Sequence, residues 1–137
     1  HPKEFKRLMG TYKDSNQRIE LQKKLSKKFK LNILIKGPFS MMTDINGNLF
    51  INSTGNPGMA TGGSGDVLTG IITGLIGRGY KPFNAMIMGV YIHGLSGDIS
   101  KKKLGEESLM ATDLIDNLPK AFKKIDNWSF LSNFIIN

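Results

Sequence analysis

Apolar residues in the first part of the chain recur every three or four positions, which is the period of an α-helix. The pattern predicts a short helix from Lys3 to Met9, stopped by Gly10, and a longer one from about Ser15 to Lys30. Apolar positions of the longer helix form a stripe that should pack on one side, opposite a face of lysines. The stripe consists of Leu21, Leu25 and Phe29.

Short apolar runs follow, and they predict strands. Residues 32–36 are rich in β-branched side chains and end at Gly37-Pro38, which fits a buried strand of an α/β sheet. Residues 41–44 and 49–52 flank an Asn46-Gly47 pair, the strongest short-range signal for a β-hairpin.

The second part of the chain carries longer apolar patterns, which predict helices over residues 67–76, 82–99 and 112–125. Small residues recur in the middle helix, and we expect them to allow close approach of a neighbouring helix. They are Ala85, Gly89, Gly94 and Gly97. Thr112 is the predicted N-cap of the last helix, and Pro119 should bend or break it. The tail over residues 127–137 is expected to pack on the domain or on a partner.

This order of elements, strands first and then helices, predicts a layered α/β domain. The few strands and many apolar helix faces make an incomplete unit, and the chain starts at His1 rather than at a methionine. We therefore expect residues 1–137 to be roughly the C-terminal half of a domain. The other half would lie N-terminal to it or on another chain, and a homo-oligomer is also expected.

Charge and composition narrow the function classes. The net charge of +8 comes from lysine pairs and triplets on predicted helix faces, not interleaved with aromatic residues, which favours solvated faces over a nucleic-acid surface. The positive charge would still attract polyphosphate ligands. No cysteine is present, which excludes disulfides and thiolate metal sites and favours a reducing cytoplasm. No apolar run approaches the roughly 20 residues of a membrane span, so no membrane partner is expected.

A glycine-rich stretch over residues 56–70 carries the candidate chemistry. Glycines at 58, 62, 63 and 65 leave backbone N–H groups uncovered, and the N-terminus of the helix that follows favours negative charge, so a phosphate fits there. Asp66 would repel that phosphate unless it removes a proton from the attacking group, which suggests phosphoryl transfer to a hydroxyl with Asp66 as general base. An ordinary loop ending in an Asp N-cap fits the same run equally well.

Other common motifs are excluded. Asp66 stands where a Walker A loop needs lysine and where a nucleophile elbow needs glycine, and no G-x-G-x-x-G spacing occurs. The histidines are His1 and His93, without metal-ligand spacing, so no protein metal site is expected. We interpret His93, inside an apolar helix, as a hydrogen-bonded core residue.

Several segments resemble the ribokinase-like superfamily, and within it most closely the ADP-dependent NAD(P)H-hydrate dehydratases. Residues 1–8 are similar to the H-P-x-E-x-x-R-L motif of that family, residues 36–40 to its K-G-x-x-T motif, and residues 56–70 to its signature loop. Residues 91–94 and 111–114 agree in order and spacing. Ser40 replaces the usual threonine and keeps the hydroxyl.

The resemblance implies a ribokinase-like α/β fold, of which this chain is the C-terminal portion, and a lyase activity that repairs hydrated NADH and NADPH. ADP, or ATP, would donate a phosphoryl group to the hydroxyl on the damaged ring, with Mg²⁺ bound to the nucleotide, and phosphate would then be eliminated. Asp66 would be the catalytic base. The anion hole would consist of Gly62, Gly63, Ser64 and Gly65. The nucleotide would contact Lys36, Gly37, Pro38, Phe39, Ser40 and Gly65, and the hydrated cofactor His1 and Asp66.

Two alternatives stay open at this point. A ribokinase-like kinase of a small alcohol, such as a vitamin precursor, would share the loop and Asp66 but not the context around His1. A nucleotide-binding module without catalysis would share the loop alone.

Overall fold

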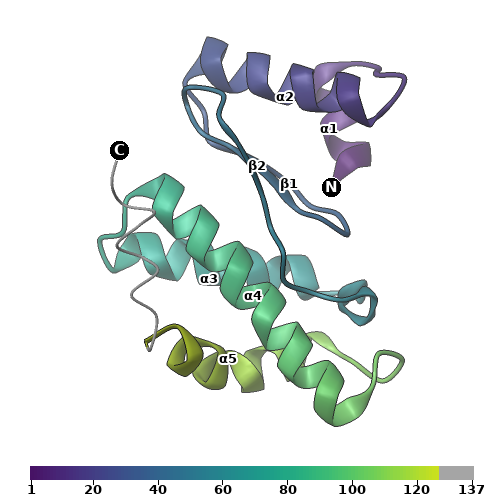
Figure 1. Cartoon of the computed structure of the whole chain (residues 1–137), viewed down its shortest axis with the longest axis vertical. Coiled ribbons are helices and arrows are strands. Elements are labelled where there is room, and N and C mark those ends of the chain that lie inside the picture. The colour runs from purple at the N-terminus through teal and green to yellow at the C-terminus, as the bar shows by residue number, and fades with distance from the viewer. Residues whose placement is uncertain (127–137) are drawn as a thin grey trace. The chain divides into compact units, whose positions relative to one another are not determined.

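The computed structural model describes residues 1–126, which form two compact units (Figure 1). The first unit contains His1–Ser53 and Ile72–Val90, and the second contains Thr54–Ile71 and continues from Tyr91. The unit boundaries fall within two of the long helices. The predicted packing of residues 127–137 lies outside the described part of the chain.

Two helices open the first unit at the places that the sequence predicts. Helix α1 spans Pro2–Met9 with Gly10 as its C-cap, and helix α2 spans Ser15–Phe29 with Asp14 as its N-cap. The Asp14 carboxylate accepts a hydrogen bond of 2.9 Å from the Gln17 backbone N–H, which satisfies one of the free donors in the first turn.

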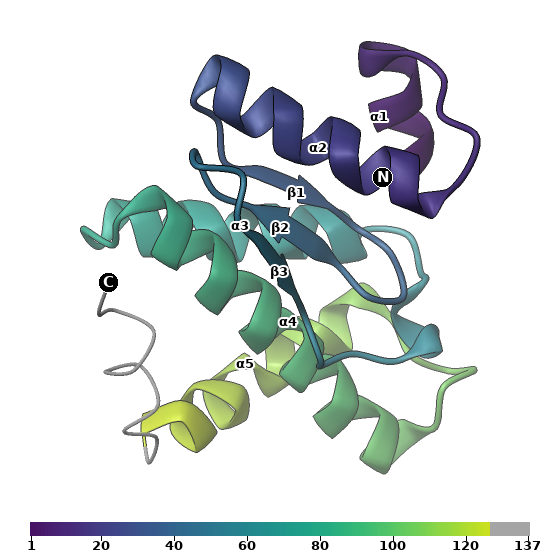
Figure 2. The same ribbon diagram turned by 45° about the horizontal axis from the view of Figure 1, so that its top comes forward.

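A small antiparallel sheet completes this part of the unit. Strands β1 (Ile33–Ile35), β2 (Met41–Thr43) and β3 (Leu49–Ile51) pair in the order β1-β2-β3, with Leu34 opposite Met42 and Met42 opposite Phe50. The predicted strand and the predicted hairpin are therefore confirmed. Figures 1 and 2 show α2 running along the sheet.

The face of α2 that packs on the sheet is more polar than the predicted stripe. Gln22 and Ser26 are fully buried, whereas Phe29 is 52% exposed, so the expectation that Leu21, Leu25 and Phe29 form the packed stripe is wrong at its C-terminal end. The Gln22 side-chain amide donates to the carbonyls of Ile33 and Met41 at 3.0 and 3.2 Å, and the Ser26 hydroxyl bonds to that of Thr43 at 2.6 Å. These bonds satisfy the Gln22 amide nitrogen and the two hydroxyls, which would otherwise be buried unpaired. The Gln22 side-chain oxygen is buried without a hydrogen-bond partner among the described residues.

The loop between β2 and β3 is organised by the Asp44 carboxylate. It accepts hydrogen bonds of 2.8 Å from the backbone N–H groups of Asn46 and Asn48 and from the Asn48 side-chain amide. Partial burial raises the pKa of Asp44, but these hydrogen bonds to the ionised form outweigh burial, and the net pKa is lowered.

Substitution Asp44→Ala should lower the free energy of unfolding by about 1 to 2 kcal/mol at neutral pH, because three hydrogen bonds to one turn are lost. A group whose pKa is lowered on folding stabilises the fold above its unfolded pKa, and this stabilisation is lost as the pH falls through the folded value. The difference between wild type and variant should therefore shrink below about pH 4. Urea unfolding at several pH values measures it, and a difference that stays constant down to pH ~3 would contradict the role of the carboxylate.

A 3₁₀ turn, η1 (Pro57–Met59), precedes α3 (Ser64–Gly77), α4 (Pro82–Leu104) and α5 (Ala111–Asp126). The second unit contains the signature loop, the first part of α3, the second part of α4 and all of α5, whereas the rest of α3 and α4 belongs to the first unit. Helix α4 is longer than predicted, because the lysines in its last turn continue the helix and their charge is favourable at a helix C-terminus. Helix α5 runs through Pro119 without a break, and it begins at Ala111, so the prediction of Thr112 as N-cap is wrong.

A buried polar network joins the second half of α4 to α5. The Ser100 hydroxyl bonds to the carbonyls of Ser96 and Asp113 at 2.9 and 3.0 Å, and it accepts a bond of 2.9 Å from the Asn117 amide. Apolar side chains buried in the same unit include Ile92 and Leu114. Among residues 1–126, no helix combines the length and the apolar character needed to cross a membrane.

Candidate active site

The second half of α4 supports the start of the signature loop. The Thr54 hydroxyl donates to the Tyr91 carbonyl at 2.9 Å, and Gly94 allows this contact, since a Cβ there would lie 2.2 Å from the Thr54 Oγ1 atom. Gly97 similarly accommodates the Met59 side chain. The expected close approach at Gly94 and Gly97 is therefore present, but the neighbour is the loop and not another helix.

Asp98, on the same helix, holds the next two residues of the loop. One carboxylate oxygen accepts a 3.0 Å bond from the Gly55 backbone N–H, and the other accepts a 3.0 Å bond from the Asn56 side-chain amide. The side-chain oxygen Oδ1 of Asn56 in turn accepts from the Gly58 N–H at 3.1 Å and caps η1. Burial, and then the charge of Asp98, raise the pKa of the Tyr91 hydroxyl.

The glycines at the end of the loop present backbone donors at the N-terminus of α3. Gly63 has a φ of +84°, a left-handed conformation that favours glycine, and a Cβ there would lie 3.2 Å from the Ala111 side chain. The N–H groups of Ser64 and Asp66 donate to the carbonyls of Thr61 and Gly63. Within the described residues, by contrast, the N–H groups of Gly62, Gly63 and Gly65 donate no hydrogen bond. They are available to an anion.

His93 holds the first residue of α3. Its Nε2 atom lies 2.9 Å from the Ser64 carbonyl oxygen and 3.3 Å from the Ser64 hydroxyl. A carbonyl oxygen only accepts, so this geometry assigns the proton to Nε2. His93 is 9% exposed, which confirms its interpretation as a hydrogen-bonded core residue. Its partner in the signature loop was not predicted.

Asp66 is the third residue of α3 and its side chain is exposed. Because α3 begins at Ser64, Asp66 lies inside the first turn and is not the N-cap, so the alternative interpretation of Asp66 as a simple cap is wrong. Its carboxylate is carried by the same helical turn that presents the free N–H of Gly65. Its role as general base stays a prediction.

The other predicted site residues lie in the first unit. Residues 36–40 connect β1 to β2, and the Ser40 carbonyl accepts from the Asn52 N–H at 2.9 Å while Phe39 is 67% exposed. The loop 62–66 belongs to the second unit, so a joint site with residues 36–40 stays a prediction.

His1 is the N-cap of α1, with its Nδ1 atom accepting from the Lys3 N–H at 3.3 Å. The predicted contact of His1 with a substrate stays a prediction.

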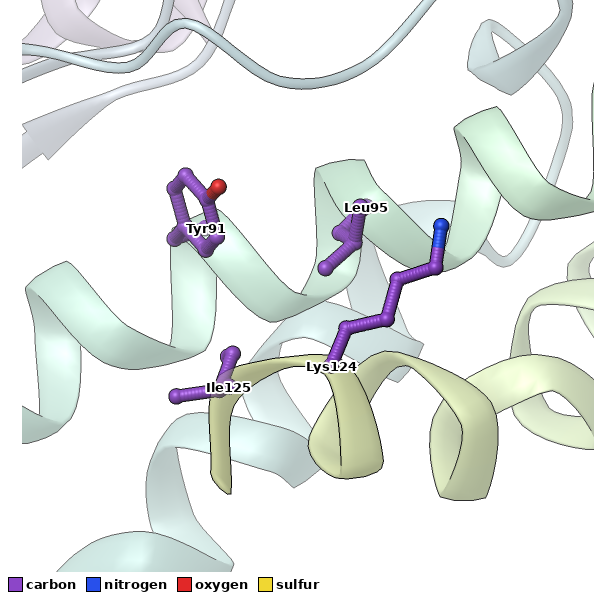
Figure 3. A pocket seen from close by; sticks show the side chains of 4 residues that line it. All are labelled: Tyr91, Leu95, Lys124 and Ile125. Atoms are coloured by element: carbon purple, nitrogen blue, oxygen red, sulfur yellow. The ribbon is translucent and has the colours of Figure 1, made fainter. Parts of the chain in front are cut away.

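A pocket of about 240 Å³ lies between α4 and α5 of the second unit. Figure 3 shows Tyr91 and Leu95 on α4 and Lys124 and Ile125 on α5 around it. None of the predicted site residues lines this pocket, so it does not bear on the candidate site.

A metal ion bound by protein side chains needs several donor side chains close together. Within the described part of the chain, no group of three or more histidine, cysteine, aspartate or glutamate side chains could hold a metal ion.

Comparison with known proteins gives a consistent result. The family model described as NAD(P)H-hydrate dehydratase matches residues 1–120. The chain is 44% identical over 128 residues to a bifunctional NAD(P)H-hydrate repair enzyme of Moorella thermoacetica, covering 92% of this chain and 24% of that protein. It is 32% identical over 128 residues to the ADP-dependent (S)-NAD(P)H-hydrate dehydratase of Bacillus subtilis, covering 92% of this chain and 46% of that protein.

A solved structure shows the same fold. It is the ADP/ATP-dependent NAD(P)H-hydrate dehydratase from Bacillus subtilis, co-crystallised with ATP and Mg²⁺ and soaked with CoA, and the TM-score is 0.82 at 32% identity. The match covers 90% of this chain and 47% of that one. The predicted ribokinase-like α/β class is confirmed, and the chain spans less than half the length of these relatives.

Proposed function

Because the chain belongs to the NAD(P)H-hydrate dehydratase family, we propose that the natural full-length protein repairs hydrated NADH and NADPH. ADP would donate a phosphoryl group to the hydroxyl of the hydrated ring, and elimination of phosphate would restore the dihydronicotinamide, with AMP as the second product. ATP is an alternative donor. The proposed compartment is the reducing cytoplasm, in keeping with a sequence that contains no cysteine.

The proposal rests on one observation: free backbone N–H donors lie next to a carboxylate at the N-terminus of α3. The N–H groups of Gly62, Gly63 and Gly65 donate no hydrogen bond within residues 1–126, and Asp66 is the next residue. Donors fixed in this way stabilise the negative charge that develops on a migrating phosphoryl group, because they need no rearrangement during the reaction. A helix N-terminus adds its positive potential.

The proposed reaction has two steps, phosphoryl transfer and elimination. Asp66 removes the proton of the substrate hydroxyl as its oxygen attacks the terminal phosphorus of ADP, and the bond to the AMP phosphate breaks. The ring nitrogen lone pair then expels inorganic phosphate from the phosphorylated carbon. Loss of a proton from the neighbouring carbon restores the ring double bond. No nucleophile of the protein takes part.

The remaining roles are proposed from the family resemblance. Lys36, Gly37, Pro38, Phe39 and Ser40 would contact the adenosine phosphate together with Gly65, and His1 would contact the hydrated cofactor. Mg²⁺ bound to the nucleotide would neutralise phosphate charge, held mainly by phosphate oxygens and water. The chain spans less than half of its relatives, so we assign only these residues, and not a whole substrate pocket, to it.

The test is incubation of the natural full-length protein with ADP, Mg²⁺ and freshly prepared hydrated NADH. We expect the absorbance of reduced nicotinamide to return in step with AMP and phosphate. AMP that forms only after a small alcohol, such as a vitamin precursor, is added, without regained absorbance, would indicate a kinase of that alcohol. Binding of ADP with no turnover of any kind would instead support a nucleotide-binding module. Either outcome contradicts the proposed dehydratase.

A further inference from the structure

The signature loop and the residues just before it contact α4 at several places, and Asp98 makes the attachment to Gly55 and Asn56. Its two carboxylate oxygens accept from the Gly55 N–H and the Asn56 amide, each at 3.0 Å. Both partners precede Gly62 in sequence, and among residues 1–126 Asp98 makes no hydrogen bond to the phosphate donors or to Asp66.

The hydrogen bonds of Asp98 hold several successive residues of the loop, and not only a single atom. The side-chain nitrogen Nδ2 of Asn56 donates to Asp98, and its side-chain oxygen Oδ1 caps η1 by accepting from the Gly58 N–H at 3.1 Å. Met59, the last residue of η1, lies against Gly97, where a Cβ would be 2.2 Å from the Met59 sulfur. A chain of defined contacts therefore runs from Asp98 through Asn56 to the residue five positions before Ser64.

The far end of the loop returns to the same helix. His93 bonds to the carbonyl of Ser64, where α3 begins. One helical segment, residues 93–98, thus holds both the start and the end of the loop that carries Gly62, Gly63 and Gly65. Displacement at either attachment would move the N–H groups relative to Asp66.

We propose that Asp98 is a positioning residue, which sets the geometry of the anion loop through Gly55 and Asn56. The kinetic part of this proposal rests on the proposed function. A loop shifted by about 1 Å can cost on the order of 100-fold in rate, because its donors no longer meet the developing charge. Nucleotide binding, which depends on other residues as well, should change less.

The key variants are Asp98→Asn and its combination with Asn56→Asp. An amide at position 98 offers one acceptor and one donor instead of two acceptors, so the Asn56 amide then faces a second donor. In the double variant, the amide introduced at 98 accepts from the Gly55 N–H and donates to the carboxylate introduced at 56. The second oxygen of that carboxylate still caps the Gly58 N–H. All three hydrogen bonds are therefore restored, and only the bond between positions 56 and 98 has its donor and acceptor exchanged.

The experiment measures kcat and the KM for ADP in the natural full-length protein, together with hydrogen–deuterium exchange of a peptide covering residues 54–66. We expect Asp98→Asn to lower kcat by about 10- to 100-fold, with the KM for ADP within about threefold of wild type and faster exchange in this peptide. The double variant should recover most of kcat and the slow exchange. Asp116→Asn, at an exposed position of α5, is the matched control and should change neither.

Three outcomes would overturn the proposal. They are a kcat of Asp98→Asn within about threefold of wild type, a double variant that recovers neither kcat nor slow exchange, and unchanged exchange in Asp98→Asn. If wild type shows no dehydratase activity, the proposed function fails by itself. The exchange data alone then decide whether Asp98 holds the loop.

Discussion

Asp66→Asn is expected to lower the kcat of the dehydratase reaction by roughly 10²- to 10⁴-fold, the usual contribution of a positioned general base. An amide cannot accept the hydroxyl proton, although it has nearly the same shape. Binding of ADP should persist, because the substitution leaves the N–H groups of Gly62, Gly63 and Gly65 in place. Removal of a negative charge beside the phosphate would even favour nucleotide binding.

The assay compares steady-state kcat with the dissociation constant for ADP measured by calorimetry in the natural full-length protein. Asp116→Asn makes the same chemical change at an exposed position of α5 and should behave as wild type. Turnover of Asp66→Asn within about tenfold of wild type would show that another group takes the proton. Loss of ADP binding would instead assign Asp66 to the nucleotide site.

Gly94→Ala should give the largest loss of stability among the glycine substitutions of α4. The new Cβ would lie 2.2 Å from the Thr54 Oγ1, 2.7 Å from its backbone carbonyl carbon and 2.8 Å from its Cβ. Thr54 also donates to the Tyr91 carbonyl, so relief of the clash breaks a hydrogen bond. We expect a net loss of about 1 to 3 kcal/mol, even after the gain of about 1 kcal/mol for alanine in a helix.

Gly97→Ala is the matched control, since it makes the same change three positions further along α4. Its Cβ would meet only side-chain atoms of Met59, the nearest being the sulfur at 2.2 Å, and this flexible side chain can move. Its effect on the free energy of unfolding should lie within about 1 kcal/mol of zero. Urea unfolding of both variants measures the change in the free energy of unfolding. A loss at Gly97 equal to that at Gly94 would contradict the distinction between backbone and side-chain contact.

Local signals predicted most of the elements because their causes lie within a few residues. The hairpin followed from the Asn46-Gly47 pair, and α1 ends at Gly10 as expected. The prediction of the packed face of α2 was wrong because Gln22 and Ser26 are buried by hydrogen bonds to strands β1 and β2. No periodicity of apolar residues reveals a polar side chain whose partner lies in another element.

In the candidate site, too, the residues that are close in sequence were predicted and the distant ones were not. Its glycines and Asp66 are contiguous, so the sequence displays them together. Asp98 and His93 were missed as supports because their partners lie 43 and 29 positions away in the chain. One signal in the sequence could have indicated the role of Asp98. An aspartate beside glycines is unusual in an otherwise apolar helix, and here its carboxylate binds the loop.

The polar network around Ser100 has a consequence for how α4 and α5 associate. Apolar helix faces tolerate sliding, since one leucine contact resembles the next. Ser100 meets the Asp113 carbonyl and the Asn117 amide, and a shift of α5 by one turn would leave these groups buried without partners. The network therefore selects a single alignment of the two helices, and it contributes uniqueness of packing more than strength.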